Sequence, residues 1–293
     1  MPRPGRRDRG LEFGVDVEVN VTKATRLNLL ICGAMRSGTT SLKAHMSEHP
    51  EIGFVDGEDI VVGDRYTGYY PFASPSLAQS LLGDDPKVYE RISARLAGKK
   101  RYIADKRAYF MFFPHIPFNL REQLPDVRLI FILRNPVEIA YSAFWYGERQ
   151  PGSAQTFEAY LAESIARIDH VSSSFRRNEW LDHFRPGSEL PVLVERGLYY
   201  PQIVRFYRLF RKEQILVLRF DRLKENPAAV MREVLRFLDL SDDFEFTDPG
   251  RIHNASPERP PLDPRIRTRL QEIYAESNRK LLSLLGWPPS LWD

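Results

Sequence analysis

The segment GAMRSGTTSL, from Gly33 to Leu42, combines residue types that can bind an anion. Gly33 and Gly38 have the glycine spacing of a nucleotide-triphosphatase phosphate loop, but that loop then requires Lys followed by Ser or Thr. Gly38 is followed here by two threonines, and Arg36 supplies a fixed charge with a planar fork of donors inside the turn. These features predict a site for a phosphate or sulfate ester that demands no metal ion. The alternative is an unliganded glycine turn between a strand and a helix.

A second pair of residues with binding chemistry lies in RLIFILRNPVEIAYSAFWYG, from Arg128 to Gly147. Arg134 ends an apolar, β-branched run, and Pro136 suits the first turn of the following helix. Ser142 lies eight residues after Arg134, about two turns into that helix at ~3.6 residues per turn. An arginine and a hydroxyl at the end of a strand can share one phosphate. The alternative is a salt bridge for Arg134 and a structural role for Ser142.

Apolar runs that alternate with helical patterns must position these residues. The runs predict strands at 27–32, 101–106, 127–133 and 214–220, and the patterns predict helices at 39–48, 136–147, 199–210, 228–238 and 264–285. This alternation predicts an α/β fold, a three-layer sandwich with a central, mostly parallel sheet and a P-loop-like phosphate-binding loop. Ligands of such sheets bind at the carboxyl ends of the strands. We expect residues 1–26 to form a flexible tail and residues 27–293 a single domain.

Composition narrows the functional classes of this 293-residue chain. Its single cysteine, Cys32, excludes an intramolecular disulfide and a Cys-rich zinc site. The net charge of +3 is too small to predict nucleic-acid binding. No apolar run is long enough for a membrane span, and the basic start MPRPGRRDRG precedes no apolar signal core. We therefore expect a cytoplasmic protein without a nucleic-acid partner; the sequence does not indicate the oligomeric state.

Together, GAMRSGTTSL and LRNPVEIAYS resemble the two cofactor motifs of sulfotransferases that use 3′-phosphoadenosine 5′-phosphosulfate (PAPS). HPEIGFVDGED, DKRAYF and SPERPPLDP add weaker similarity to the heparan-sulfate and bacterial branch of that family. The resemblance spans residues 28–287 and implies PAPS as the donor, with no metal required. It implies that the 5′-phosphosulfate binds to Arg36, Ser37, Gly38, Thr39 and Thr40.

The resemblance also assigns residues to the other end of the nucleotide. Arg134 and Ser142 match the arginine and serine that bind the 3′-phosphate in the family. The segment RGLYYPQI resembles a helix start on the cofactor side, which puts Tyr199 near the nucleotide. Arg259, in the late loop, would cap the 3′-phosphate.

The resemblance implies a carboxylate as the general base. The cytosolic branch uses a histidine, but Ala108 stands at that position here. The heparan-sulfate branch uses a glutamate shortly after a His-Pro pair, and counting from His49–Pro50 the match is Glu58. Asp56 and Asp59 flank Glu58 and are alternative candidates.

Two cations complete the implied catalytic set. In-line transfer of the sulfuryl group should pass through a loose transition state, much as phosphoryl transfer does. Such a transfer needs cations near the developing negative charge, correct positioning of the acceptor and a base for the acceptor proton. Arg36 occupies a position that often carries lysine in the family, yet an arginine cannot give up a proton. Lys106 matches the lysine of the strand-end motif and would orient the acceptor or offset charge; the alternative is a surface lysine.

Two other functions stay open at this point. A P-loop nucleotide kinase would need a loop lysine and a strand-end aspartate for Mg²⁺, whereas Arg134 ends the strand here. A nucleotide-binding scaffold without catalysis would bind the cofactor and transfer nothing. The acceptor is predicted to be a small molecule, a glycolipid or a carbohydrate, sulfated on oxygen or nitrogen.

Overall fold

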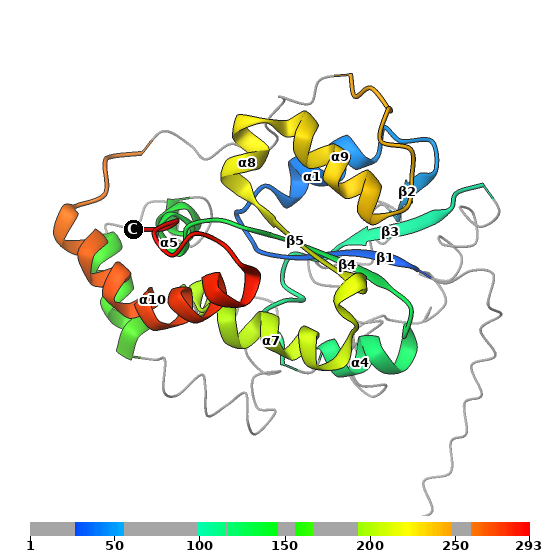
Figure 1. Ribbon diagram of the computed structural model, residues 1–293. Coiled ribbons are helices and arrows are strands. Elements are labelled where there is room, and N and C mark those ends of the chain that lie inside the picture. Colours follow the sequence, from blue (N-terminus) through cyan, green and yellow to red (C-terminus); the bar gives the residue numbers. More distant parts are fainter. Residues whose placement is uncertain (1–26, 56–98, 115, 146–155, 167–192, 248–258) are drawn as a thin grey trace, which may run out of the picture.

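The computed structural model describes residues 27–55, 99–114, 116–145, 156–166, 193–247 and 259–293. Within these ranges one sheet of five strands runs through the molecule in the order β2-β3-β1-β4-β5, and each neighbouring pair is parallel (Figure 1). The strands are β1 (Leu29–Gly33), β2 (Ile52–Phe54), β3 (Tyr102–Lys106), β4 (Arg128–Leu133) and β5 (Ile215–Arg219).

Strand β1 lies at the centre of the sheet, where both of its faces are covered. All five of its residues are buried, as a parallel strand between two helical layers requires. Leu29 and Ile31 pack into the apolar cluster on one face, while Leu30 and Cys32 pack into the cluster on the other. This division follows from the alternation of side chains along a strand.

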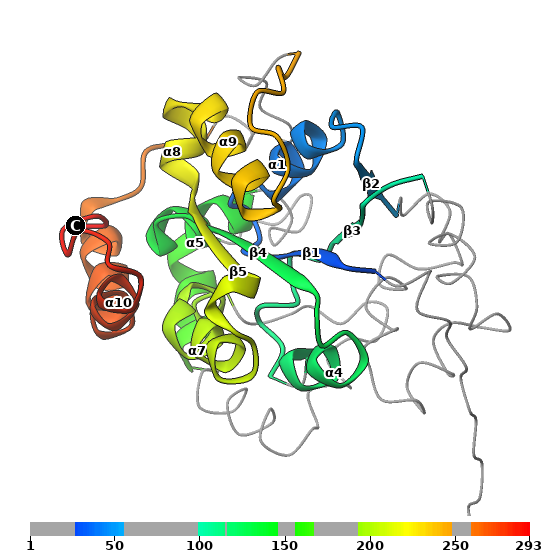
Figure 2. The same cartoon turned by 45° about the vertical axis from the view of Figure 1, so that its right-hand side comes forward.

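Helices cover both faces of the sheet (Figures 1 and 2). On one face lie α1 (Thr39–Met46), α8 (Phe220–Glu225) and α9 (Pro227–Phe237), and on the other lie α4 (Ile116–Gln123) and α7 (Tyr199–Leu209). Two more helices, α5 (Pro136–Ala143) and α10 (Pro264–Leu285), pack against each other beyond the carboxyl ends of the strands. The three-layer α/β prediction is confirmed.

Helix α10 has a local sequence signal at each of its ends. Pro264 is its first residue, and the Asp263 carboxylate accepts a hydrogen bond from the backbone N–H of Arg265 at 2.7 Å. Gly286 ends the helix with a left-handed φ of 66°, the usual role of a glycine after a helix.

Three elements were not predicted from the sequence. Strand β2 has only three residues, with Gly53 in the middle, which is too short for a periodic pattern. Helix α4 was missed, and α8 was hidden because Phe220 continues the apolar run of β5. The strand predicted at 214–220 therefore ends at Arg219. The division into a tail and a single domain stays a prediction.

Candidate active site

The phosphate-binding loop joins β1 to α1 through two residues with left-handed backbones. The φ angle is 58° at Arg36 and 85° at Gly38. A Cβ at position 38 would lie 2.8 Å from a ring carbon of Phe220, the first residue of α8. Gly38 is therefore required both for its φ angle and for the close approach of α8 to the loop.

Helix α1 begins directly after Gly38 with three hydroxyl residues, Thr39, Thr40 and Ser41. Its first turn contains no acidic side chain, and Gly38 has no side chain to cap it. The first N–H groups of a helix have no partners within the helix and, together with the helix dipole, favour an anion. The loop and the start of α1 therefore offer a group of N–H and hydroxyl donors.

Lys106 reaches this group of donors from the end of β3. Its Nζ donates a hydrogen bond to Thr40 Oγ1 at 3.3 Å. Burial lowers the pKa of Lys106, and so do the nearby Lys43 and Arg107, whereas Asp105 acts in the opposite direction. The predicted catalytic lysine thus lies beside the loop rather than on the outer surface.

Asp105 is the buried carboxylate beneath this strand end. It accepts hydrogen bonds from the backbone N–H of Lys106 at 2.6 Å and from Arg107 Nε at 2.8 Å. Burial raises the pKa of Asp105, and the ion pair with Arg107 partly opposes that shift. The carboxylate holds the backbone at Lys106 and the Arg107 side chain in place.

The two cofactor motifs predicted from the sequence meet in the structure. Arg36 Nε donates to Ser142 Oγ at 3.3 Å, although 106 positions separate the two residues. Arg134 Nη1 donates to the backbone carbonyl of Arg36, also at 3.3 Å. The contact follows from the pairing of β1 with β4, because Ala34 still donates its N–H to the carbonyl of Ile132 at 2.8 Å where the loop begins.

Arg134 lies between the end of β4 and an aromatic ring. Its guanidinium carbon is 4.9 Å from the centre of the Phe220 ring, a favourable cation–π geometry. Asn135 caps the following helix by accepting the N–H of Val137 at 2.9 Å. Burial lowers the pKa of Arg134 and Glu138 opposes the shift, and the group stays cationic because an arginine starts far above neutral pH.

Tyr199 connects the end of β4 with the loop from behind. Its hydroxyl donates to the carbonyl of Arg134 at 3.0 Å and is hydrogen-bonded to the Ser37 side chain. The residue is fully buried, which raises its pKa, so the hydroxyl is a neutral donor near pH 7. Tyr199 thus lies behind Arg134, and its predicted contact with the nucleotide stays a prediction.

Arg259 joins the site through Glu138, a residue that was not predicted from the sequence. Its Nη2 lies 3.2 Å from Glu138 Oε2, and the same oxygen lies 3.7 Å from Arg134 Nη2. Arg267 of α10 also reaches Glu138, with Nη2 2.9 Å from Oε1. Glu138 lies only four positions after Arg134, so this pair is local in the sequence. No local signal exists for Arg267, which lies 129 positions from Glu138.

The predicted base and its alternatives, Glu58, Asp56 and Asp59, lie outside the described residues. Val55, the last described residue before these carboxylates, donates its N–H to the carbonyl of Ala104 in β3 at 2.8 Å. The choice of Glu58 as base stays a prediction.

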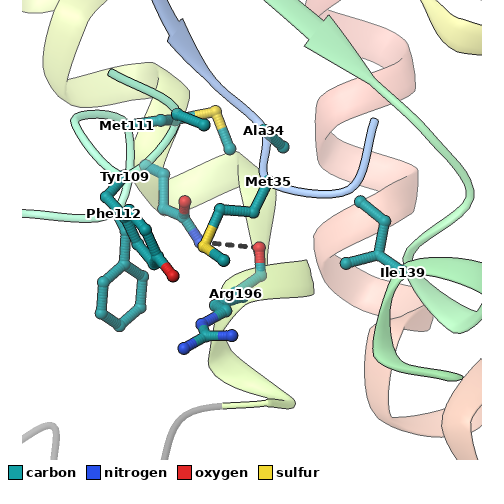
Figure 3. A pocket seen from close by; sticks show the side chains of 9 residues that line it. Ala34, Met35, Tyr109, Met111, Phe112, Ile139 and Arg196 are labelled. Atoms are coloured by element: carbon teal, nitrogen blue, oxygen red, sulfur yellow. Dashed lines mark hydrogen bonds between the residues drawn. The ribbon is translucent and has the colours of Figure 1, made fainter. Parts of the chain in front are cut away.

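A small pocket lies beside the loop (Figure 3). Among the side chains that line it are those of Met35, Tyr109, Met111, Phe112, Ile139 and Arg196. The guanidinium carbon of Arg196 is 5.6 Å from the centre of the Tyr109 ring. Gln202 Nε2 donates to the carbonyl of Arg196 at 3.3 Å. The loop therefore borders an aromatic, sulfur-containing surface with one cation.

A model of the sulfotransferase domain family matches residues 27–249. The chain belongs to this family. A solved sulfotransferase from Alicyclobacillus acidocaldarius has the same fold, with a TM-score of 0.68 and 24% identity over 91% of this chain and 98% of that chain.

Curated relatives of this sulfotransferase domain are longer proteins. Human carbohydrate sulfotransferase 15 is 23% identical over 301 residues, which cover 89% of this chain and 54% of the relative. Mouse bifunctional heparan sulfate N-deacetylase/N-sulfotransferase 4 is 24% identical over 306 residues, which cover 90% of this chain and 30% of the relative. The chain thus spans about half, or less, of the length of these relatives.

Family membership decides against the nucleotide kinase considered above. In the described part of this sulfotransferase domain, no three His, Cys, Asp or Glu side chains are grouped as metal ligands. The helices in the same ranges include none that is long and apolar enough to cross a membrane.

The loop geometry predicts a large effect of Gly38→Ala. The left-handed φ and the contact with Phe220 should together lower the free energy of unfolding by roughly 2–4 kcal/mol. Gly286→Ala is the matched control, because Gly286 is also left-handed and has nothing within 4 Å of the added Cβ. It should cost only roughly 1–2 kcal/mol. Urea unfolding of both variants measures the difference, and equal losses would show that Phe220 moves aside without cost.

Proposed function

We propose that this chain transfers the sulfuryl group of PAPS to a hydroxyl or amine of an acceptor. The main support is the contact of Arg36 with both Ser142 and Arg134, at the carboxyl ends of two adjacent parallel strands. Family membership supports sulfuryl transfer. A nucleotide donor with phosphates at both ends of its ribose suits a site to which two separate motifs contribute cations.

The residues present fit such a donor. The loop, the start of α1 and Lys106 would hold the phosphosulfate end, and Arg134, Ser142 and Arg259 would hold the 3′-phosphate. Arg259 Nη1 is buried and has no hydrogen-bond partner in the described structure, and a phosphate oxygen would supply one. Cations, hydroxyls and N–H groups predominate in this donor set, which is the chemistry that binds oxyanions.

In the proposed transfer, one side chain stabilises the developing charge and another can transfer a proton. When bound, PAPS supplies an activated sulfuryl group on a phosphate leaving group. Arg36 and the first N–H groups of α1 stabilise negative charge that develops on the leaving oxygen. Arg36 keeps its proton throughout. Lys106, with its lowered pKa, is the cation at the loop that can transfer one.

Glu58 is proposed as the general base that removes the proton of the acceptor hydroxyl or amine as its bond to sulfur forms. Asp56 and Asp59 remain the alternative carboxylates. The cytoplasmic location also remains a prediction.

The relatives' names favour a carbohydrate among the three predicted acceptor classes. One relative is named a carbohydrate sulfotransferase and another a heparan sulfate N-sulfotransferase. We therefore propose a carbohydrate acceptor first and a glycolipid or other small molecule second.

The decisive experiment measures binding and transfer without metal. In calorimetry with EDTA, the chain should bind PAPS and its desulfated product, 3′-phosphoadenosine 5′-phosphate (PAP). In a separate titration with Mg²⁺ and no EDTA, it should bind ATP far more weakly. Incubation of PAPS with carbohydrate, glycolipid and small-molecule acceptors should then release PAP. Binding of PAPS without release of PAP on any acceptor would instead support the inactive scaffold. Failure to bind PAP would contradict the proposal.

The 3′-phosphate assignment predicts weaker PAP binding in Arg134→Ala and Ser142→Ala. Loss of the charge-assisted contact at Arg134 should cost about 1.5–3 kcal/mol, and loss of the hydroxyl less. Arg128→Ala is the matched control, because Arg128 is the first residue of β4 and Arg134 follows the last residue of that strand. It should leave PAP affinity unchanged in calorimetry. Unchanged affinity in both site variants would refute the assignment.

Glu58→Gln tests the proposed base. The change keeps the shape of the side chain and removes the proton acceptor, so turnover should fall on the order of 10²–10⁴-fold. PAP binding should stay nearly intact, and single-turnover rates at saturating PAPS separate the two effects. If Asp56→Asn or Asp59→Asn abolishes turnover while Glu58→Gln does not, the base is the neighbouring aspartate.

A further inference from the structure

Glu138 lies among three arginines that come from three parts of the chain. Its Oε1 is 2.9 Å from Arg267 Nη2, and its Oε2 is 3.2 Å from Arg259 Nη2 and 3.7 Å from Arg134 Nη2. Arg134 follows β4, Arg259 precedes α10, and Arg267 lies in the first turns of α10. One carboxylate on the first turn of α5 therefore holds the strand end and the last helix together.

Aromatic contacts fix the orientation of two of these guanidinium groups. The Arg259 guanidinium carbon is 4.7 Å from the centre of the Tyr141 ring, and the Tyr141 hydroxyl donates to the carbonyl of Pro260 at 2.7 Å. Arg134 lies over Phe220. Tyr141 is the residue next to Ser142, so the Arg259 segment is attached directly to the predicted 3′-phosphate site.

The charges of the cluster do not balance. Three guanidinium groups face one carboxylate, and like charges at this range repel each other. The Nη1 donor of Arg259 is also buried without a hydrogen-bond partner within the described ranges. The cluster thus has surplus positive charge, and Arg259 Nη1 is a hydrogen-bond donor that a further anion beside Ser142 could use.

We propose that Glu138 is a positioning residue of the 3′-phosphate site and that Arg267 is a third arginine of that site. The inference rests on the proposed function. Glu138 acts on a bound phosphate in two opposite ways, because it gathers the arginines but also repels the anion. The positioning effect outweighs the repulsion for two reasons. Three cations already compensate the negative charge of Glu138, and arginines that are held in place lose less conformational freedom when the phosphate binds. The cluster thereby selects nucleotides that carry a phosphate on the 3′ oxygen.

The test compares two nucleotides on the full chain by calorimetry. PAP has the 3′-phosphate, and adenosine 5′-phosphate lacks it. Glu138→Gln should weaken PAP binding about tenfold or more and change the affinity for adenosine 5′-phosphate by less than about twofold, since that ligand does not reach the cluster. A general structural defect would weaken both ligands alike. Glu138→Asp, which keeps the charge, should recover part of the PAP affinity.

Arg267→Ala tests the third arginine, and Arg265→Ala is its matched control. Arg265 lies half a turn earlier in α10 and pairs with Asp263 instead of Glu138. Arg267→Ala should weaken PAP binding severalfold and leave adenosine 5′-phosphate unaffected, whereas Arg265→Ala should change neither. Equal effects of the two variants would remove Arg267 from the site.

The outcomes separate this inference from the function on which it rests. If the unmodified chain binds PAP no better than adenosine 5′-phosphate, the 3′-phosphate site itself is wrong and both proposals fail. If the unmodified chain prefers PAP and Glu138→Gln binds PAP equally well or more tightly, the proposed function stands and the positioning role of Glu138 is overturned.

Discussion

The parallel pairing of β1 with β4 is the interaction on which the whole site depends. It sets the loop after Gly33 beside Arg134, because the carboxyl ends of parallel neighbours lie at the same edge of a sheet. The ladder shifts register between Ile31 and Gly33, where the chain leaves β1 and turns into the loop. A slip by one residue would reverse which side chains of β1 face each layer. The burial of β1 on both faces therefore also protects the geometry of the site.

Two aromatic residues behind the loop, Phe220 and Tyr199, transmit this constraint to the binding groups. Phe220 packs closely against Gly38 and also lies under the Arg134 guanidinium. Tyr199 holds the carbonyl of Arg134 and the side chain of Ser37 from the other side. Helix α8 follows β5, and α7 begins at Tyr199, so elements from both faces of the sheet meet at one loop. Binding groups supported in this way need little reorganisation when an anion arrives.

The electrostatic design differs from that of a triphosphatase loop. There, one lysine and a metal ion neutralise the transferring phosphate. Here Arg36 supplies a permanent charge inside the turn, and Lys106 approaches from β3 with a pKa lowered by burial. The loop region therefore contains an arginine and a lysine from two different strand ends, rather than a single loop lysine. Outside the loop, Glu138 pairs with Arg134 and Arg259, while Asp105 accepts the backbone N–H of Lys106 and pairs with Arg107.

The sequence by itself determined the sheet-forming runs, the loop, and the residues of both cofactor motifs. It did so because apolar runs, Gly38 and Pro136 are local signals that act within a few residues of chain. The same reasoning missed β2, α4 and α8, which are short or continue a neighbouring pattern. Glu58 stays a prediction because residues 56–98 lie outside the described structure.

Only the tertiary structure decided which of these residues meet. The strand order β2-β3-β1-β4-β5 brings Arg36 within hydrogen-bond distance of Ser142, and the packing of α10 against α5 brings Arg267 to Glu138. Such contacts join segments more than 100 positions apart, and no periodicity along the chain encodes them. They arise because burial of both faces of one sheet selects a single arrangement of strands and helices, and that arrangement sets the distances between charges.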